Sequence, residues 1–172
     1  MLSLYSKVIN CPVIELKTQT QIGVVDDLVL HKTKLEVHAV TLKKSSLFDF
    51  NEAQVVINTD IVEINSKAVI VNNPDSIVPL SEAIRIKEAI DDKYYGIYQK
   101  VVSTKGKTIG MVYDYLVDSS SQKIVKIYCR TLFNEKIIPS SSVIKMEGKK
   151  IFIKDDYELE RITSPAVGPS VV

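Results

Sequence analysis

The chain has 172 residues, of which 45% are hydrophobic and 25% charged, a composition that suits one or two small globular domains. Lys and Arg number 22 and Asp and Glu number 21, and this balance excludes a net electrostatic attraction to nucleic acid or to an anionic membrane. Two cysteines exclude a disulfide framework, and the sequence holds neither a signal-peptide pattern nor the ~18 apolar residues of a membrane span. We therefore expect a soluble, cytoplasmic protein with reduced thiols.

The first part of the chain has the pattern of short β-strands. Runs rich in Val and Ile alternate with turn residues at the spacing typical of a small all-β barrel or sandwich. The turn-forming run from Asn72 to Ser76 is expected to end a first domain over residues 1–76. The predicted strands are Val13–Leu16, Gly23–Leu30, Glu36–Leu42, Gln54–Ile57, Ile61–Asn65 and Ala68–Val71.

A helical pattern then interrupts the strands. Ser81 is a suitable N-cap, and Ala83, Ile86 and Ile90 follow at three- and four-residue spacing with charged residues between them. We predict a helix of about three turns. It would form a helical linker over residues 77–93.

The strand pattern resumes in a predicted second domain over residues 94–156. The residues that follow, 157–172, include two Pro and one Gly and are expected to form a flexible tail or to dock as an extended strand. The predicted strands are Lys100–Ser103, Ile109–Asp118, Ile124–Arg130, Lys136–Ile138, Val143–Met146 and Lys150–Ile153.

The two parts of the chain resemble each other. Order and approximate spacing persist along both parts, with short insertions in the later strands, which indicates a duplicated unit. Residues that match at a constant offset of 87 positions are Ile14 and Val101, Ile22 and Ile109, Gly23 and Gly110, Val25 and Val112, Asp27 and Asp114, Val37 and Ile124, and Val40 and Ile127.

Glycines lie at a turn and at the start of the long strands of the repeated unit. Gly106 suits a hairpin turn, because glycine adopts positive φ without strain. Gln19 replaces it in the first copy, which predicts a different or more strained turn there. Gly23 and Gly110 each open a long strand, where a glycine usually marks a bulge or a bend.

An aspartate lies in the middle of each long strand, at Asp27 and Asp114. Aspartate is disfavoured inside strands, so we expect both to accept backbone N–H bonds at a bend, with a ligand or partner contact as the alternative. Regular alternation would place Tyr113 and Tyr115 on one face of the second strand and Asp114 on the other.

This joint pattern resembles the PRC-barrel family. The resemblance covers both halves, and the first copy departs from it at Gln19, Asn58 and Ser66. It implies two tandem small PRC-type β-barrels joined by a short α-helix, in a mainly all-β, largely non-catalytic protein whose role is contact with other proteins. The second copy keeps Gly106, Gly110, Asp114, Pro139, Val143 and Gly148.

Residues with catalytic or metal-binding chemistry are few. His31 and His38 could approach each other, but no third ligand has a suitable spacing, and the second half has no histidine to activate a serine or cysteine. Cys11 and Cys129 are expected to pack as small apolar residues. We assign no catalytic, cofactor-binding or metal-binding residue and expect no cofactor.

Tyrosines form the candidate partner interface. The run from Tyr94 to Tyr98 could bind a protein, could stack on single-stranded RNA, or could simply pack the linker helix onto the second barrel. We expect a non-enzymatic adaptor with a protein partner, and self-association stays open. The alternative is a ribosome maturation or RNA-associated assembly factor, although nucleic acid is the less favoured partner. The candidate interface residues are Tyr94, Tyr95, Tyr98, Tyr113 and Tyr115.

Overall fold

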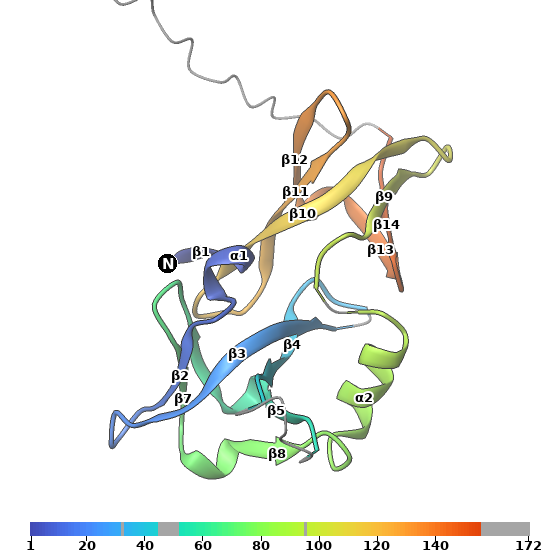
Figure 1. Cartoon of the computed structure of the whole chain (residues 1–172). Coiled ribbons are helices and arrows are strands. Elements are labelled where there is room, and N and C mark those ends of the chain that lie inside the picture. Colours follow the sequence, from blue (N-terminus) through green and yellow to red (C-terminus); the bar gives the residue numbers. More distant parts are fainter. Residues whose placement is uncertain (32, 45–51, 95, 156–172) are drawn as a thin grey trace, which may run out of the picture.

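The computed structural model describes residues 1–31, 33–44, 52–94 and 96–155 and consists mainly of two seven-stranded β-sheets (Figure 1). The predicted all-β class is confirmed. The predicted tail and Tyr95 lie outside the described residues. No helix in the described part of the chain is long and apolar enough to span a membrane.

The first sheet contains every strand predicted for the first half, with ends within two residues of those expected. It has the order β6-β7-β2-β3-β4-β5-β8. The last strand, β8, was not predicted: its residues, assigned to the helical linker, pair antiparallel with β5 instead. The strands are β2 (Pro12–Glu15), β3 (Gln21–Leu30), β4 (Val37–Leu42), β5 (Gln54–Ile57), β6 (Ile61–Ile64), β7 (Val69–Val71) and β8 (Ile77–Pro79).

The second sheet has the order β12-β11-β10-β9-β14-β13, which is the strand order of the first sheet without β8. A short N-terminal strand, β1 (Leu2–Leu4), pairs with β10 in addition, and α1 (Tyr5–Val8) follows it. The other strands are β9 (Lys100–Ser103), β10 (Thr108–Asp118), β11 (Ile124–Arg130), β12 (Glu135–Pro139), β13 (Val143–Glu147) and β14 (Lys150–Ile153). The 3-10 turns are η1 (Asn58–Asp60), η2 (Pro74–Ser76) and η3 (Ser140–Ser142).

The pairing registers support the duplication. Each half has one parallel pair, β2 with β7 and β9 with β14. The antiparallel pair β3 and β4 has the same register as β10 and β11 when 87 is added to each residue number, and both pairs are bulged at the same two points. The repeated sequence therefore specifies a repeated sheet.

The helix α2 (Ile84–Asp91) begins later than its sequence suggested. Ser81 is not the N-cap, because its amide and hydroxyl instead bind the Glu52 carboxylate at 2.6 and 2.8 Å. Of the predicted apolar residues, Ala83 and Ile86 are buried and Ile90 is partly buried, and Ala89 is buried as well.

The backbone angles explain the glycines predicted at turns and strand starts. Gly106 has φ +81°, and Gln19 adopts φ +57°, which is the strained turn expected of the first copy. A side chain on Gly110 would place its Cβ 2.8 Å from the backbone oxygen of Arg130. The close approach of the two strands therefore requires glycine at this position. Gly148 adopts positive φ between β13 and β14, and Pro139 ends β12.

The two halves are interlocked as well as joined by the helix α2. The N-terminal strand β1 lies along β10 of the second sheet. Reciprocally, the amide of Leu30 in β3 donates to the carbonyl of Tyr94, and the amide of Gly96 donates to Leu28. The segment that leads into each half therefore makes backbone hydrogen bonds with the long strand of the other half.

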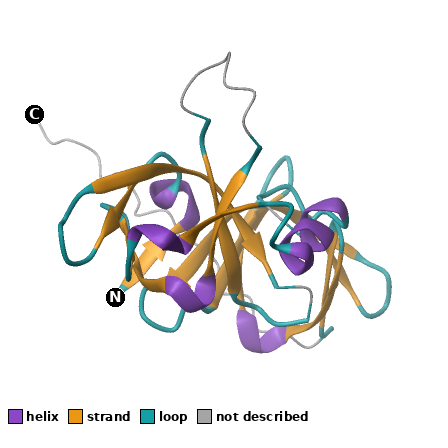
Figure 2. Cartoon of the chain, turned by 90° about the horizontal axis from the view of Figure 1, so that it is seen from below, coloured by secondary structure: helices purple, strands orange, loops and turns teal. Residues whose placement is uncertain are grey.

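The turns and the core join the halves further. The Gln122 side chain donates to the carbonyl of Ile61 at 2.9 Å, and the Val37 amide donates to the carbonyl of Gln122. Buried hydrophobic residues of both sheets form one cluster, and Figure 2 shows the strands meeting at the centre of the molecule with helical turns on either side. A shared core is physically reasonable, because a unit of about 75–85 residues buries little surface alone.

Candidate functional site

Two of the candidate interface tyrosines are core residues. Tyr115 is 1% exposed and its hydroxyl donates to Gln99 at 2.7 Å, while Tyr94 is buried and donates to the carbonyl of Met146 at 3.1 Å. Both side chains, predicted at the candidate interface, are therefore part of the core of this structure. For Tyr115 the reason is the bulge in β10 after Val112, which breaks the regular alternation so that Tyr115 no longer shares a face with Tyr113.

The other two described candidates, Tyr98 and Tyr113, do meet at the surface. Tyr98 is 65% exposed, and its backbone amide is fixed by a 3.0 Å bond to the Val112 carbonyl. We name the hollow that they share, of about 450 Å³, the tyrosine groove. Its lining residues are Tyr98, Thr108, Gly110, Met111, Val112, Tyr113, Arg130, Thr131 and Leu132.

Aromatic and cationic groups are stacked beside the groove. The guanidinium carbon of Arg130 lies 5.4 Å from the ring centroid of Tyr113, a cation–π distance, and the rings of Tyr113 and Tyr128 are 6.1 Å apart. Partial burial, together with the nearby Glu135 carboxylate, raises the pKa of Tyr113. The Tyr113 hydroxyl therefore stays protonated at neutral pH and can donate a hydrogen bond.

Exposed apolar side chains extend this surface beyond the groove. Leu132 and Phe133 occupy the turn between β11 and β12 and are 94% and 89% exposed. The Thr131 hydroxyl oxygen orders the turn by accepting the Asn134 amide at 3.2 Å. Sequence reasoning missed this pair, although two large apolar residues inside a predicted turn were a visible signal.

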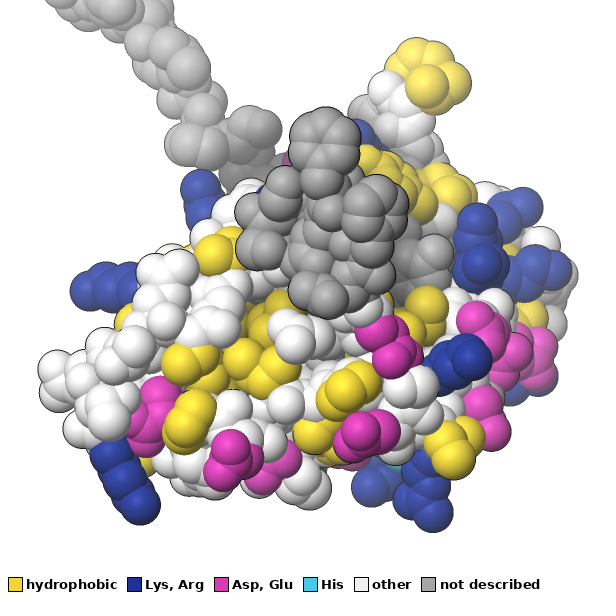
Figure 3. All heavy atoms as spheres, turned by 60° about the horizontal axis from the view of Figure 1, so that its bottom comes forward, with side chains coloured by type: hydrophobic (Ala, Val, Ile, Leu, Met, Phe, Trp, Pro, Cys, Tyr) yellow, Lys and Arg dark blue, Asp and Glu magenta, His cyan; other side chains and the backbone are white. Residues whose placement is uncertain are grey.

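The equivalent face of the first half carries different side chains. At the 87-residue offset Tyr113 and Tyr128 correspond to Asp26 and Thr41, which line a hollow together with Leu80 and Ile90 of the segment between the halves. In Figure 3, which brings this side of the molecule forward, hydrophobic and acidic side chains are intermixed and most Lys and Arg lie toward the margins. The tyrosine groove thus presents aromatic side chains where the first half has Asp26 and Thr41.

The repeated aspartates lie between the halves rather than in the groove. Asp27 accepts bonds from the Tyr5 hydroxyl at 2.7 Å and from the amide of Leu28 at 2.6 Å. Asp114 accepts the Ser6 amide at 3.1 Å, the Ser6 hydroxyl at 2.5 Å and the Tyr115 amide at 2.8 Å. Both do accept backbone N–H groups, as expected, and both also receive hydroxyls of the N-terminal segment.

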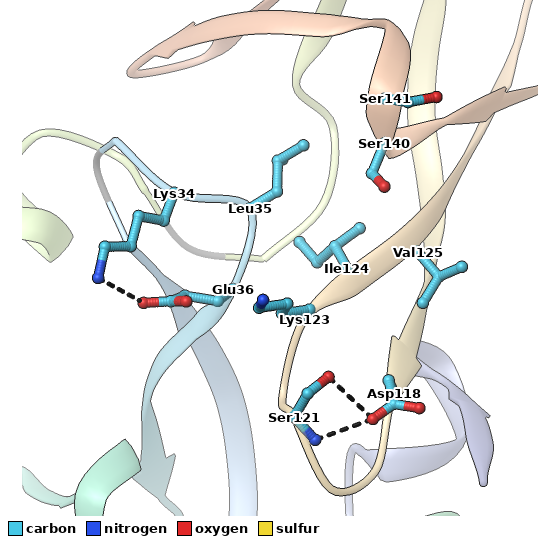
Figure 4. A pocket seen from close by; sticks show the side chains of 10 residues that line it. All are labelled: Lys34, Leu35, Glu36, Asp118, Ser121, Lys123, Ile124, Val125, Ser140 and Ser141. Carbon is cyan, nitrogen blue, oxygen red and sulfur yellow. Dashed lines mark hydrogen bonds and ion pairs between the residues drawn. The ribbon is translucent and has the colours of Figure 1, made fainter.

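A second hollow, of about 730 Å³, lies where hairpins from the two halves meet (Figure 4). Four of its polar side chains form two pairs: Lys34 lies 3.5 Å from Glu36, and the Ser121 hydroxyl donates to Asp118 at 2.9 Å. The bonds from Ser121 and Ser120 lower the pKa of Asp118 to about 2. Such a carboxylate does not act as a base at neutral pH, so Ser121 is not activated as a nucleophile.

The histidines and cysteines do not assemble a metal site. The rings of His31 and His38 are 4.7 Å apart, and partial burial lowers the pKa of His38. Cys11 and Cys129 are buried free thiols, and burial raises the pKa of Cys129 to about 11. No group of three or more His, Cys, Asp or Glu that could hold a metal occurs among the described residues.

Comparison with known families gives one match. Residues 2–78 match the PRC-barrel domain. The first half of this chain is a PRC-barrel domain. Its matched segment includes β1 at one end and the start of β8 at the other, and the second half, outside the match, repeats its strand order. A search of curated proteins found no match.

Proposed function

We propose that this PRC-barrel protein is a non-enzymatic adaptor that binds a protein partner through the tyrosine groove. The observation that carries the proposal is the contrast between equivalent faces of the two halves. One has Asp26 and Thr41 in a hollow bordered by the segment between the halves, and the other presents Tyr98, Tyr113 and Arg130. PRC-barrel domains are generally non-catalytic, which agrees with this role.

The chemistry of the groove suits protein recognition. Tyr and Arg are enriched among the residues that dominate binding energies, because each combines a large contact area with directional hydrogen bonds. Arg130 already stacks on Tyr113, so part of the surface is ordered before a partner arrives. Leu132 and Phe133 add apolar surface at the rim.

The test begins with a photo-cross-linker placed at residue 132 of the full chain, in lysate of the native organism. The captured protein is then purified and its affinity measured by calorimetry for the native chain, Leu132→Ala and Leu16→Ala. Both leucines are at least half exposed, but Leu16 belongs to the first half. We expect Leu132→Ala to weaken binding about tenfold or more and Leu16→Ala to leave it unchanged. Equal affinities for all three chains would disprove the assignment of the groove.

Association with a ribosomal particle or RNA is the alternative, because Tyr98, Tyr113 and Arg130 could also stack on bases. It makes a different prediction. Affinity would fall steeply with salt, since cations that contact phosphates release counterions on binding. Co-sedimentation with ribosomes at low and at moderate salt separates the two functions.

A further inference from the structure

Exposed residues from six neighbouring strands of the second sheet form one continuous row across its outer face. The pairing registers place them directly opposite one another, and residues paired in this way point to the same face of a sheet. Every member of the row is exposed. In strand order from β12 to β13 (Figure 1), the row consists of Glu135, Arg130, Met111, Lys100, Lys150 and Glu147.

The row places two lysines side by side. Lys100 and Lys150 are direct partners in the parallel pair of β9 and β14, and neighbouring like charges repel each other. The acid on the other side of Lys150 is Glu147, whose carboxylate binds Lys145 at 2.5 Å. Within the described part of the chain, neither Lys100 nor Lys150 forms an ion pair of its own. The fold therefore keeps an unfavourable pair, which indicates a role outside the fold.

The first half has a different residue at the position of the first lysine. Met111 corresponds to Val24 at the offset of 87 residues, and the strand partner of Val24 is Pro12, where that of Met111 is Lys100. The overall charge differs in the same direction. Residues 94–155 hold 11 Lys and Arg against 5 Asp and Glu, whereas residues 1–76 hold 7 against 9. The cationic row is therefore a property of the second half, where positive charge predominates.

The row passes through the tyrosine groove. Met111 and Arg130 line the groove, and Lys100 lies directly beside Met111 on the next strand, two residues after Tyr98. Adjacent strands are about 4.8 Å apart, so the cations extend over roughly 14 Å from Lys150 to Arg130. That length corresponds to about four residues of extended chain. The cations and the groove therefore form one surface with the dimensions of a short peptide.

We propose that the partner of the tyrosine groove presents a short acidic segment, which lies across the strands with its carboxylates on Lys150, Lys100 and Arg130. Carboxylates placed there relieve the repulsion between the two lysines. Apolar side chains of the same segment contact Met111 and Tyr98, which are both exposed. This inference rests on the proposed function, because it names the chemistry of the partner that the groove binds.

The acids at the two ends of the row favour a short acidic segment over a nucleic acid. Glu135 and Glu147 flank the cations, one at each side of the sheet. A long polyanion that continued beyond the cations would meet these carboxylates and be repelled. A segment of a few residues ends before it reaches them. The charge pattern of the row therefore selects for both the sign and the length of what binds.

The first test uses a fluorescent hexapeptide, Glu-Leu-Glu-Glu-Leu-Glu, whose binding to the full chain is followed by fluorescence anisotropy at low salt. We expect it to bind about tenfold or more tightly than Gln-Leu-Gln-Gln-Leu-Gln, because only the first peptide carries carboxylate side chains. A single-stranded uridine hexanucleotide should bind more weakly than the acidic peptide. Equal affinities for the two peptides would overturn the proposal, and tighter binding of the nucleotide would assign the row to nucleic acid instead.

Charge reversal locates the binding site of the acidic hexapeptide. The double variant Lys100→Glu, Lys150→Glu should weaken binding about tenfold or more. The control Lys17→Glu, Lys67→Glu makes the same change at exposed positions of the first half and should leave binding unchanged. Equal losses in the two variants would overturn the proposal. Lys100→Gln alone should leave the midpoint of thermal unfolding unchanged or raise it, since it removes a repulsion from the folded state. A lowered midpoint would show that this lysine serves the fold, against the proposal.

The protein captured by the cross-linker at residue 132 separates this inference from the proposed function. If Leu132→Ala weakens binding of that protein and the reversal of Lys100 and Lys150 does not, the groove assignment holds and the acidic segment is overturned. If only the lysine reversal weakens binding, the row is supported and the groove assignment is wrong. Loss of binding in both variants supports both, and unchanged binding in both overturns both.

Discussion

The hydroxyl of Ser6 lies 2.5 Å from a carboxylate oxygen of Asp114, a residue 108 positions later in the chain. The Tyr5 hydroxyl makes the corresponding bond to Asp27 in the other half. Adjacent residues of α1 thus contact both repeated aspartates. The carboxylate in each long strand therefore fixes the N-terminal segment between the two sheets, which explains why an unfavourable residue for a strand occurs in both copies.

Removing the Asp114 carboxylate should destabilise the fold. Asp114→Ala leaves the Ser6 and Tyr115 amides without their acceptor, and a buried unsatisfied donor costs about 1–3 kcal/mol, so we expect a total loss of about 2–4 kcal/mol. Urea denaturation of the native chain and the variant measures the loss. Asp26→Ala, at an exposed position of β3, is the control and should change stability by less than about 0.5 kcal/mol. Equal losses in the two variants would contradict the role of Asp114.

The stability of the protein should depend on pH through Asp27. Burial raises the pKa of Asp27 above its usual value despite the bonds from Tyr5 and Leu28. The folded state therefore binds the proton of Asp27 more tightly than the unfolded state does. This proton binding stabilises the fold below the ordinary carboxyl pKa, and the stabilisation is lost as the pH rises through the raised pKa of folded Asp27. Asp27→Asn removes this titration. We expect the free energy of unfolding, measured from pH 3 to pH 7, to fall less with rising pH in Asp27→Asn than in the native chain. The same pH dependence in both chains would contradict the assignment.

The two strand-opening glycines should respond differently to alanine. The Cβ of Gly110→Ala would meet the backbone oxygen of Arg130 at 2.8 Å, where only a shift of the strand relieves the clash, and we expect a loss of about 1–3 kcal/mol. The Cβ of Gly23→Ala would meet the end of the Leu42 side chain at 3.1 Å, which can move, so the expected loss is below about 1 kcal/mol. Thermal denaturation of both variants checks the order, and a larger effect at position 23 would refute it.

Neither thiol should react in the folded protein. Cys129 is buried and its pKa is raised to about 11, and burial also raises the pKa of Cys11. Because the thiolate is the reactive form, a chromogenic disulfide reagent at pH 7 should label both cysteines only after unfolding. Rapid labelling of Cys129 in the native chain would contradict its burial.

The sequence by itself determined the repeat and most strand boundaries. These follow from local patterns: alternation of apolar residues, turn formers, and glycines where positive φ or close approach is needed. The PRC-barrel assignment also came from such patterns, and the match over residues 2–78 agrees with it. The exposed Leu132 and Phe133 were readable in the same way but were overlooked.

Only the tertiary structure decided which tyrosines are accessible and how the halves join. Regular alternation placed Tyr115 on the same face as Tyr113, but the bulge in β10 separates the two, and its position is set by pairing with β11 rather than by residues near Tyr115. The pairing of β1 with β10 and of β8 with β5 joins segments distant in sequence. The strands β1 and β8 are too short to show the alternation of apolar and polar residues that predicts a strand. Long-range pairing therefore decided that Tyr115 is buried while Tyr98 and Tyr113 line the groove.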